Sequence, residues 1–186
     1  TFTATNGATT LASQTVTLTS TDIGRGYVDV TFAKPNDGTT QTVKVNYTNL
    51  AGKDATDTQP TDSATLDATV PRNASVGLDI QISTDTSDDG LVNATELNGA
   101  ATFTSHITFD KTKAVLGDTI VVTAINGTGT PTVVNHVLTS TDMGSGSFDL
   151  TFAKPAEGQT QTVTANYVDA AGNAATDTAP TDNAKL

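Results

Sequence analysis

The sequence predicts an all-β protein, and three observations lead to this fold class. Threonine and valine, which favour strands, are frequent, and no stretch has a convincing helical period. Short segments alternate apolar and polar residues, as at 28–32, 43–47 and 148–152, and turn residues such as Asn126-Gly127 separate them. The third observation is that the chain repeats itself.

Residues 121–186 repeat residues 1–66 without gaps at an offset of 120, with 36 identities in the 66 positions. The run Leu-Thr-Ser-Thr-Asp at 18–22 recurs at 138–142, for example. Residues 67–120 have no counterpart in the other copy. The chain therefore holds about one and a half copies of a single module: a partial copy at 1–70, with the start of a linker, and a complete copy at 71–186.

The complete copy is expected to have seven strands, A to G. Their predicted ranges are 76–83, 101–109, 118–125, 132–138, 146–153, 159–168 and 183–186. Short alternating strands with a turn every ten or so residues are typical of a Greek-key, immunoglobulin-like β-sandwich, so we expect tandem sandwiches of this kind.

Residues 1–66 supply strands C to G only, and half of one sheet's core pairing is therefore missing from this copy. We expect it to be either truncated or completed by another chain through strand pairing. Pro71 stiffens the linker between the copies, which is too short to act as a free tether.

Composition excludes several functions. The 186 residues include 9 Lys and Arg against 20 Asp and Glu, and a net charge of -11 argues against nucleic acid and anionic membranes as partners. Cysteine is absent, which excludes disulfides and thiolate chemistry. No apolar run is long enough to insert into a membrane, and we expect neither a membrane-spanning segment nor a signal peptide. His106 and His136 stand alone without a nucleophile motif, so we expect no enzyme and no small-molecule substrate.

One segment carries metal chemistry. Residues 85–96 place oxygen ligands where a twelve-residue EF-hand calcium loop has them. The predicted ligands are Asp85, Ser87, Asp89, the carbonyl of Leu91, Asn93 and Glu96. Calcium needs six or seven oxygens at about 2.3–2.6 Å, so the loop must wrap around the ion, and Gly90 at position 6 permits the sharp bend. The alternative is an acidic hairpin between strands A and B in a protein already rich in aspartate.

Acidic residues also gather where two modules would meet. Asp67 lies in the linker, Asp79 begins strand A, and Asp169 begins the Asp-Ala-Ala-Gly-Asn turn between strands F and G. We expect a second calcium ion between modules from these residues. The alternative is that 169–173 is a tight turn whose side chains bond its own backbone.

Four motifs together resemble a known family. They are the loop at 85–97, Leu-Gly-Asp-Thr at 116–119, the turn at 169–173 and Leu-Asp-Ala-Thr-Val-Pro at 66–71. They resemble the bacterial Ig-like repeats of giant RTX adhesins, which Gram-negative bacteria export by type I secretion, and the resemblance covers essentially the whole chain. It implies that the six loop residues bind Ca²⁺ and that Asp67 is a ligand between modules. Two departures are Ser87 in place of Asp or Asn, and the absence of the loop from the first copy.

The resemblance implies an extracellular extender module of a large adhesin on the bacterial cell surface. Such a module projects distal ligand-binding domains for attachment and biofilm formation, and its partners are neighbouring repeats of the same chain. Repeats at over half identity independently suit a spacer. The alternative function is an Ig-like ligand-binding module that grips a carbohydrate or a host protein, with Tyr27 as the available aromatic side chain. Homotypic adhesion between cells is a third possibility.

Overall fold

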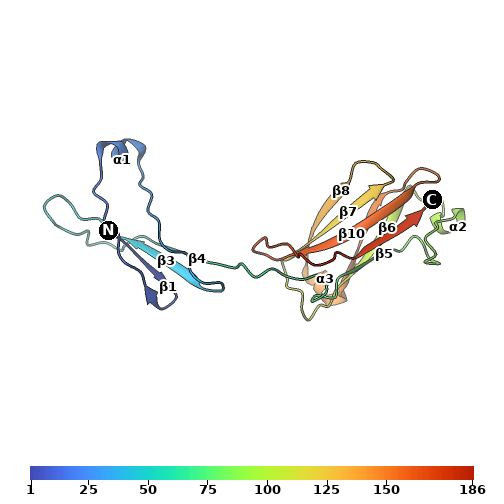
Figure 1. Cartoon of the computed structure of the whole chain (residues 1–186), viewed down its shortest axis with the longest axis horizontal. Coiled ribbons are helices and arrows are strands. Elements are labelled where there is room, and N and C mark those ends of the chain that lie inside the picture. Colours follow the sequence, from blue (N-terminus) through green and yellow to red (C-terminus); the bar gives the residue numbers. More distant parts are fainter. The chain divides into compact units, whose positions relative to one another are not determined.

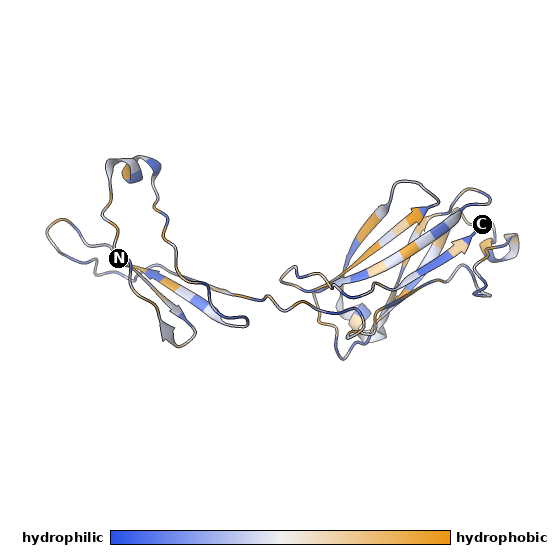
Figure 2. Cartoon of the chain, in the orientation of Figure 1, coloured by the Kyte–Doolittle hydropathy of each residue, from blue (hydrophilic) through white to orange (hydrophobic).

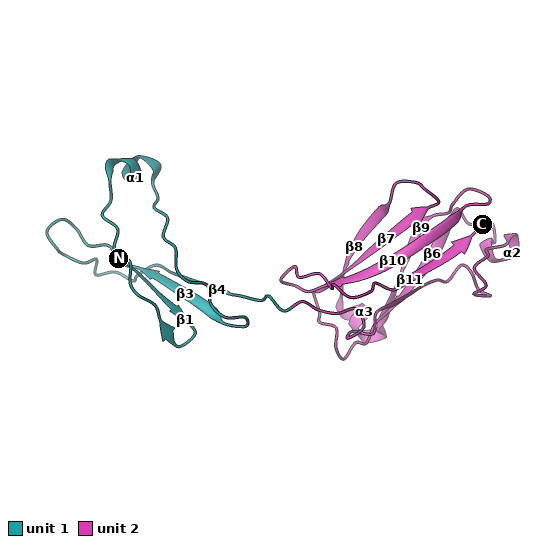
Figure 3. Cartoon of the chain, viewed as in Figure 1, with its two compact units in different colours: residues 1–69 teal, residues 70–186 magenta.

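The computed structural model describes residues 1–186, which are mostly β-structure in several antiparallel sheets. The chain divides into two compact units, unit 1 at 1–69 and unit 2 at 70–186 (Figure 3). The expected all-β class is confirmed. None of the helices has the length and apolar character that crossing a membrane requires.

Unit 2 contains two sheets with seven strands in total (Figure 1). The four-stranded sheet has the order β11-β10-β7-β8, from β7 (Thr119–Asn126), β8 (Thr132–Val137), β10 (Thr160–Val168) and β11 (Thr181–Lys185). The three-stranded sheet has the order β5-β6-β9, from β5 (Asp79–Ile82), β6 (Thr102–Thr108) and β9 (Ser147–Ala153). Each of the seven predicted ranges contains or overlaps one of these strands.

The two sheets of unit 2 share one apolar core because their strands alternate as the sequence does. Along β6, β7 and β10 every second side chain is buried. Hydrophobic and hydrophilic residues follow one another along β10, which lies in front (Figure 2). Phe103, Ile107, Ile120 and Val163 are completely buried in this core. Each such side chain stabilises the fold by about 1.5–3 kcal/mol relative to exposure.

Unit 1 has one sheet, of order β2-β1-β3-β4. Its strands are β1 (Phe2–Asn6), β2 (Thr9–Thr10), β3 (Thr40–Val45) and β4 (Thr61–Thr65). Residues 27–33, the counterparts of β9, form no strand. The reason is that β9 pairs with β6, and β6 has no counterpart among residues 1–66.

Three short helices interrupt the strands, where the sequence predicted none. They are α1 (Ser20–Arg25), α2 (Ala94–Leu97) and α3 (Ser140–Ser145). One or two turns are too few to produce a helical period, so hydrophobic patterning could not reveal them. Their ends are nevertheless encoded locally. Capping boxes join Thr19 to Asp22, Asn93 to Glu96 and Thr139 to Asp142.

Candidate metal centre

The predicted calcium loop, residues 85–96, begins shortly after β5 and ends within α2. Two residues take left-handed backbone conformations in the bend, Asp88 with φ 55° and Gly90 with φ 79°. The second of these is the position where the sequence required glycine, since a side chain there would be strained.

Asp85, at loop position 1, is buried and accepts hydrogen bonds from the loop's own groups. Its Oδ2 atom accepts the backbone N–H of Gly90 at 2.8 Å. Its Oδ1 atom lies 3.3 Å from the Ser87 hydroxyl and 3.4 Å from the backbone nitrogen of Asp89. The carboxylate therefore organises the first half of the loop.

Glu96, at position 12, closes the loop from the other side. Its Oε1 atom accepts the backbone N–H of Ser87 at 3.1 Å and lies 3.0 Å from that residue's hydroxyl, and its Oε2 atom accepts the backbone N–H of Asn93 at 3.0 Å. These bonds, first the one from Asn93 and then those from Ser87, hold the pKa of the Glu96 carboxyl below its usual range. The group is therefore ionised at neutral pH.

Ser87 links the two ends of the loop, because its hydroxyl lies within hydrogen-bond distance of both carboxylates. The structure thus brings together positions 1, 3 and 12. The other predicted ligands have local contacts: Asp89 Oδ1 accepts the Leu91 N–H at 2.9 Å, and Asn93 Oδ1 caps α2. No three acidic or histidine side chains form a group that could hold a metal ion, in the loop or elsewhere.

The donor set of the loop nevertheless suits a calcium ion by its chemistry. Every predicted ligand supplies oxygen, which is the ligand that hard cations take, and the carboxylates of Asp85, Asp89 and Glu96 supply negative charge. Asp85, Ser87 and Glu96 already lie within a chain of hydrogen bonds. The carboxylates of Asp85 and Glu96 accept hydrogen bonds from backbone N–H groups of the loop and from the Ser87 hydroxyl. A bound ion would therefore compete with this hydroxyl for the same carboxylate oxygens.

An anchor that sequence reasoning missed ties the loop to the last strand. The Val92 N–H donates to the carbonyl of Lys185 in β11 at 2.7 Å, and the Lys185 N–H donates to the carbonyl of Gly90 at 2.9 Å. Leu91 and Lys185 form a parallel bridge, and the Val92 side chain is buried in the core. Val92, the apolar residue at loop position 8, was the only feature of the sequence that pointed to this anchor. The alignment of the loop with β11 cannot be seen in a local motif.

The residues predicted to hold a second ion are divided between the two units. Asp67 belongs to unit 1, where its Oδ1 atom accepts the Thr69 N–H at 3.1 Å. Asp79 is exposed at the start of β5, opposite Thr108. Neither Asp79 nor Asp169 takes part in a cluster of three acidic side chains.

Asp169 is held within its own turn. It accepts the backbone N–H of Asn173 at 2.8 Å and lies 3.0 Å from that residue's side-chain nitrogen. Burial acts to raise the pKa of Asp169, but these two hydrogen bonds, together with those from the backbone of Ala171 and Gly172, outweigh it and leave the pKa lowered. This arrangement is the one described by the alternative interpretation, in which 169–173 is a turn bonded to its own backbone.

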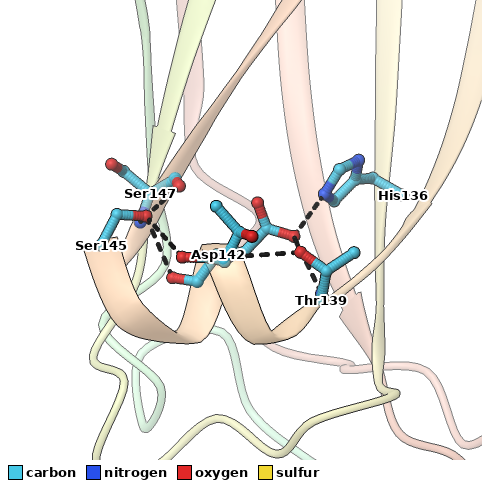
Figure 4. Close-up of polar contacts among 6 residues, drawn as sticks. His136, Thr139, Asp142, Ser145 and Ser147 are labelled. Atoms are coloured by element: carbon cyan, nitrogen blue, oxygen red, sulfur yellow. Dashed lines mark hydrogen bonds and ion pairs between the residues drawn. The ribbon is translucent and has the colours of Figure 1, made fainter.

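A second cluster of polar side chains surrounds α3 (Figure 4). His136, stacked on the ring of Phe148 at 3.8 Å between centroids, places its Nε2 atom 3.0 Å from Asp142 Oδ2. The same carboxylate oxygen accepts the N–H and the hydroxyl of Thr139. The Ser145 hydroxyl lies against backbone carbonyls of its own turn and of Ser147, not against the histidine. The cluster therefore caps and braces a helix.

Comparison with known proteins gives no relative: no family model matches the chain, and no curated protein sequence matches it.

Proposed function

We propose that the chain is part of a calcium-stabilised extender: tandem Ig-like β-sandwich modules of a bacterial cell-surface adhesin. The observation that carries the proposal is the loop at 85–96, where Asp85, Ser87 and Glu96 are joined by hydrogen bonds and the loop is fixed to β11. The close repeat and the resemblance to bacterial Ig-like adhesin repeats support it. Neighbouring modules of the same chain are the partners of such a spacer.

The residues of the loop would do two things in this function. Asp85 and Glu96 would hold an ion from opposite ends of the segment, with Ser87, Asp89, Asn93 and the Leu91 carbonyl as further oxygen ligands. Bound calcium supplies two positive charges that offset the repulsion between these carboxylates. Since Val92 and Gly90 bond to Lys185, stabilising the loop also fixes the end of β11.

The export route implied by the family resemblance gives calcium a regulatory role. Extracellular calcium modules bind at about 10⁻⁴ to 10⁻³ M, so an outside medium saturates them and the cytosol does not. The net charge of -11 favours an expanded, flexible chain when no cation is bound. The chain would thus remain loosely folded during export and stiffen outside the cell.

Calcium titration by calorimetry, with thermal melts in calcium and in chelator, tests the proposal. At a calcium concentration one hundred times Kd, we expect a stabilisation of unit 2 of about 2.7 kcal/mol. Glu96→Gln should abolish most of this gain, because it removes the charged bidentate ligand. Glu157→Gln, at an exposed position of unit 2 outside the predicted ligand sets, is the matched control, and it should retain the heat of binding to the loop.

Failure of the chain to bind calcium, with identical melts in calcium and chelator, would refute the loop assignment. The chain would then be a plain Ig-like repeat, and ligand binding would become the leading function. Tyr27 would be the residue to examine in that case, because it is exposed and carries the Arg25 guanidinium 4.6 Å from its ring centroid.

A further inference from the structure

Three asparagines in the chain are followed directly by glycine: Asn6, Asn98 and Asn126. In such a pair the backbone nitrogen of the glycine can attack the side-chain amide carbon of the asparagine, because glycine has no side chain to obstruct the approach. The three pairs consist of the same two residues. A large difference in their reactivity would therefore come from the structure around each pair.

Asn126 is held by both atoms of its side-chain amide. Its side-chain nitrogen donates to the Ala153 carbonyl at 2.9 Å, and its Oδ1 atom accepts from the side chain of Gln161 at 2.8 Å. The N–H of Gly127 donates to the Thr160 carbonyl at 2.7 Å. The amide carbon and the attacking nitrogen are therefore both fixed by hydrogen bonds.

Asn6 has the same arrangement in unit 1. Its side-chain nitrogen donates to the Ala33 carbonyl at 3.2 Å, and its Oδ1 atom accepts from the side chain of Gln41 at 2.8 Å. The N–H of Gly7 donates to the Thr40 carbonyl at 2.8 Å. Attack at either of these two pairs would first have to break such contacts.

Asn98, by contrast, ends α2 on the surface of unit 2 with its side chain unrestrained. Asn98 and Gly99 are both exposed, and neither the Asn98 side-chain amide nor the Gly99 N–H makes a hydrogen bond. A Cβ atom at residue 99 would meet no atom of a more distant residue within 4 Å. The space around this pair is therefore open.

Few contacts hold the end of α2. The helix has only four residues, and its last turn is closed by the Asn98 N–H on the Ala94 carbonyl at 3.1 Å and by the Ala100 N–H on the Leu97 carbonyl at 2.8 Å. The Asn98 backbone is left-handed, with φ 44° and ψ 40°. An exposed terminal turn opens at little cost in free energy, and opening lets the side chain of Asn98 approach the Gly99 nitrogen.

We propose that Asn98 is a site of spontaneous deamidation, a modification that needs water and no enzyme. The Gly99 nitrogen loses its proton to solvent and bonds to the side-chain carbon of Asn98, and ammonia leaves with a proton from solvent, which closes a cyclic imide. Water then opens the ring at either carbonyl, giving aspartate or isoaspartate. Both products add a negative charge close to Glu96, and isoaspartate also lengthens the backbone at the end of α2.

The test incubates the full chain at neutral pH in chelator and follows each pair by peptide mass spectrometry. Cleavage after lysine and arginine places the three pairs on separate peptides, which are 1–25, 73–111 and one that begins at 114. In the folded chain, Asn98 should deamidate about tenfold or more faster than Asn6 and Asn126, since those two must first open locally. In guanidinium chloride the three rates should become similar. The proposal is overturned if Asn98 reacts no faster than the other two in the folded chain, or if unfolding leaves the differences unchanged.

The variant Asn98→Gly identifies the reacting residue, because glycine readily adopts the left-handed conformation of this position and has no amide to lose. Peptide 73–111 of this variant should gain no mass, while the slow change at Asn126 continues as in the parent chain. A continued gain of mass in peptide 73–111 would assign the reaction to Asn73 or Asn93 and not to Asn98, and the proposal would fail. The measurement is made without calcium, so its result is independent of whether the loop at 85–96 binds the ion.

Discussion

The two units present nearly the same sequence in two settings. Gln41 bonds to Asn6 Oδ1 and to the Ala33 carbonyl, each at 2.8 Å, and Gln161 makes the matching bonds in unit 2 at 2.8 and 3.0 Å. Helices α1 and α3 begin with the same capping box. Yet Leu18 is exposed and Leu138 is buried.

The difference separates local from long-range contributions to the fold. Helix caps, turns and contacts whose partners all lie within residues 1–66 also form in the matching part of unit 2, because each copy contains every partner. Burial of the core depends on β5 and β6, which only unit 2 contains. Identical residues should therefore differ sharply in what they contribute to stability, and matched substitutions can measure this.

The largest difference is expected for the leucine pair. Leu138→Ala should destabilise unit 2 by about 2–5 kcal/mol, since it leaves a cavity in a filled core. Leu18→Ala should change the stability of unit 1 by no more than about 0.5 kcal/mol. Urea unfolding followed residue by residue by NMR measures both, and equal losses would mean that unit 1 buries Leu18 in solution.

A smaller difference in stability is expected for the asparagine pair, and here the two substitutions should act in opposite directions. Asn166→Ala removes the shorter of the two hydrogen bonds that the buried Asn73 side-chain nitrogen donates and leaves only the one to the Asp177 carbonyl at 3.4 Å, at a cost of about 1–3 kcal/mol. Asn46→Ala removes a buried acceptor that has no partner, so unit 1 should keep or slightly gain stability. The same unfolding measurement applies. A loss of stability on Asn46→Ala would reveal a partner for that oxygen within the chain.

The smallest effect concerns the helix caps and depends on pH. Burial acts to raise the pKa of Asp142, but hydrogen bonds from Thr139 and then His136 leave it below the ordinary value of 3.8. The ionised cap therefore stabilises unit 2 above pH 3.8, and this contribution is lost as the pH falls through the lowered pKa. Asp142→Ala should cost about 0.5–2 kcal/mol at neutral pH and progressively less in acid.

The matched variant Asp22→Ala should cost less, because its carboxylate lies on an exposed helix and its cationic partner, Arg25 at 3.5 Å, is itself exposed. Unfolding curves at several pH values compare the two. A cost that stayed constant down to the lowest pH would show that the Asp142 charge does not contribute.

Much of unit 2 follows from the sequence because the relevant signals are short-range. Alternation predicted all of its strands, and residue spacing predicted a loop at 85–96 whose ends the structure joins through Ser87. The first strand of unit 2 was predicted to begin at residue 76, but β5 begins at Asp79. Gly77 takes a left-handed conformation with φ 57° at the end of a turn over residues 73–77.

The remaining features depend on contacts between distant residues. Asn73 bonds to Asn166 across 93 positions, and nothing in its own neighbourhood marks it. The bond from Val92 to Lys185 likewise depends on how β11 is aligned beside the loop. The short helices were missed for a different reason, because their capping boxes were the only signal.

The parallel bridge between the loop and Lys185 has a mechanical consequence. Both backbone groups of Lys185 bond to the loop, one to Gly90 and one to Val92. A pull transmitted along β11 loads these two bonds in shear, so they must break together instead of opening one after the other. We expect the bridge to act as a clamp that makes the end of unit 2 resist tension applied along β11.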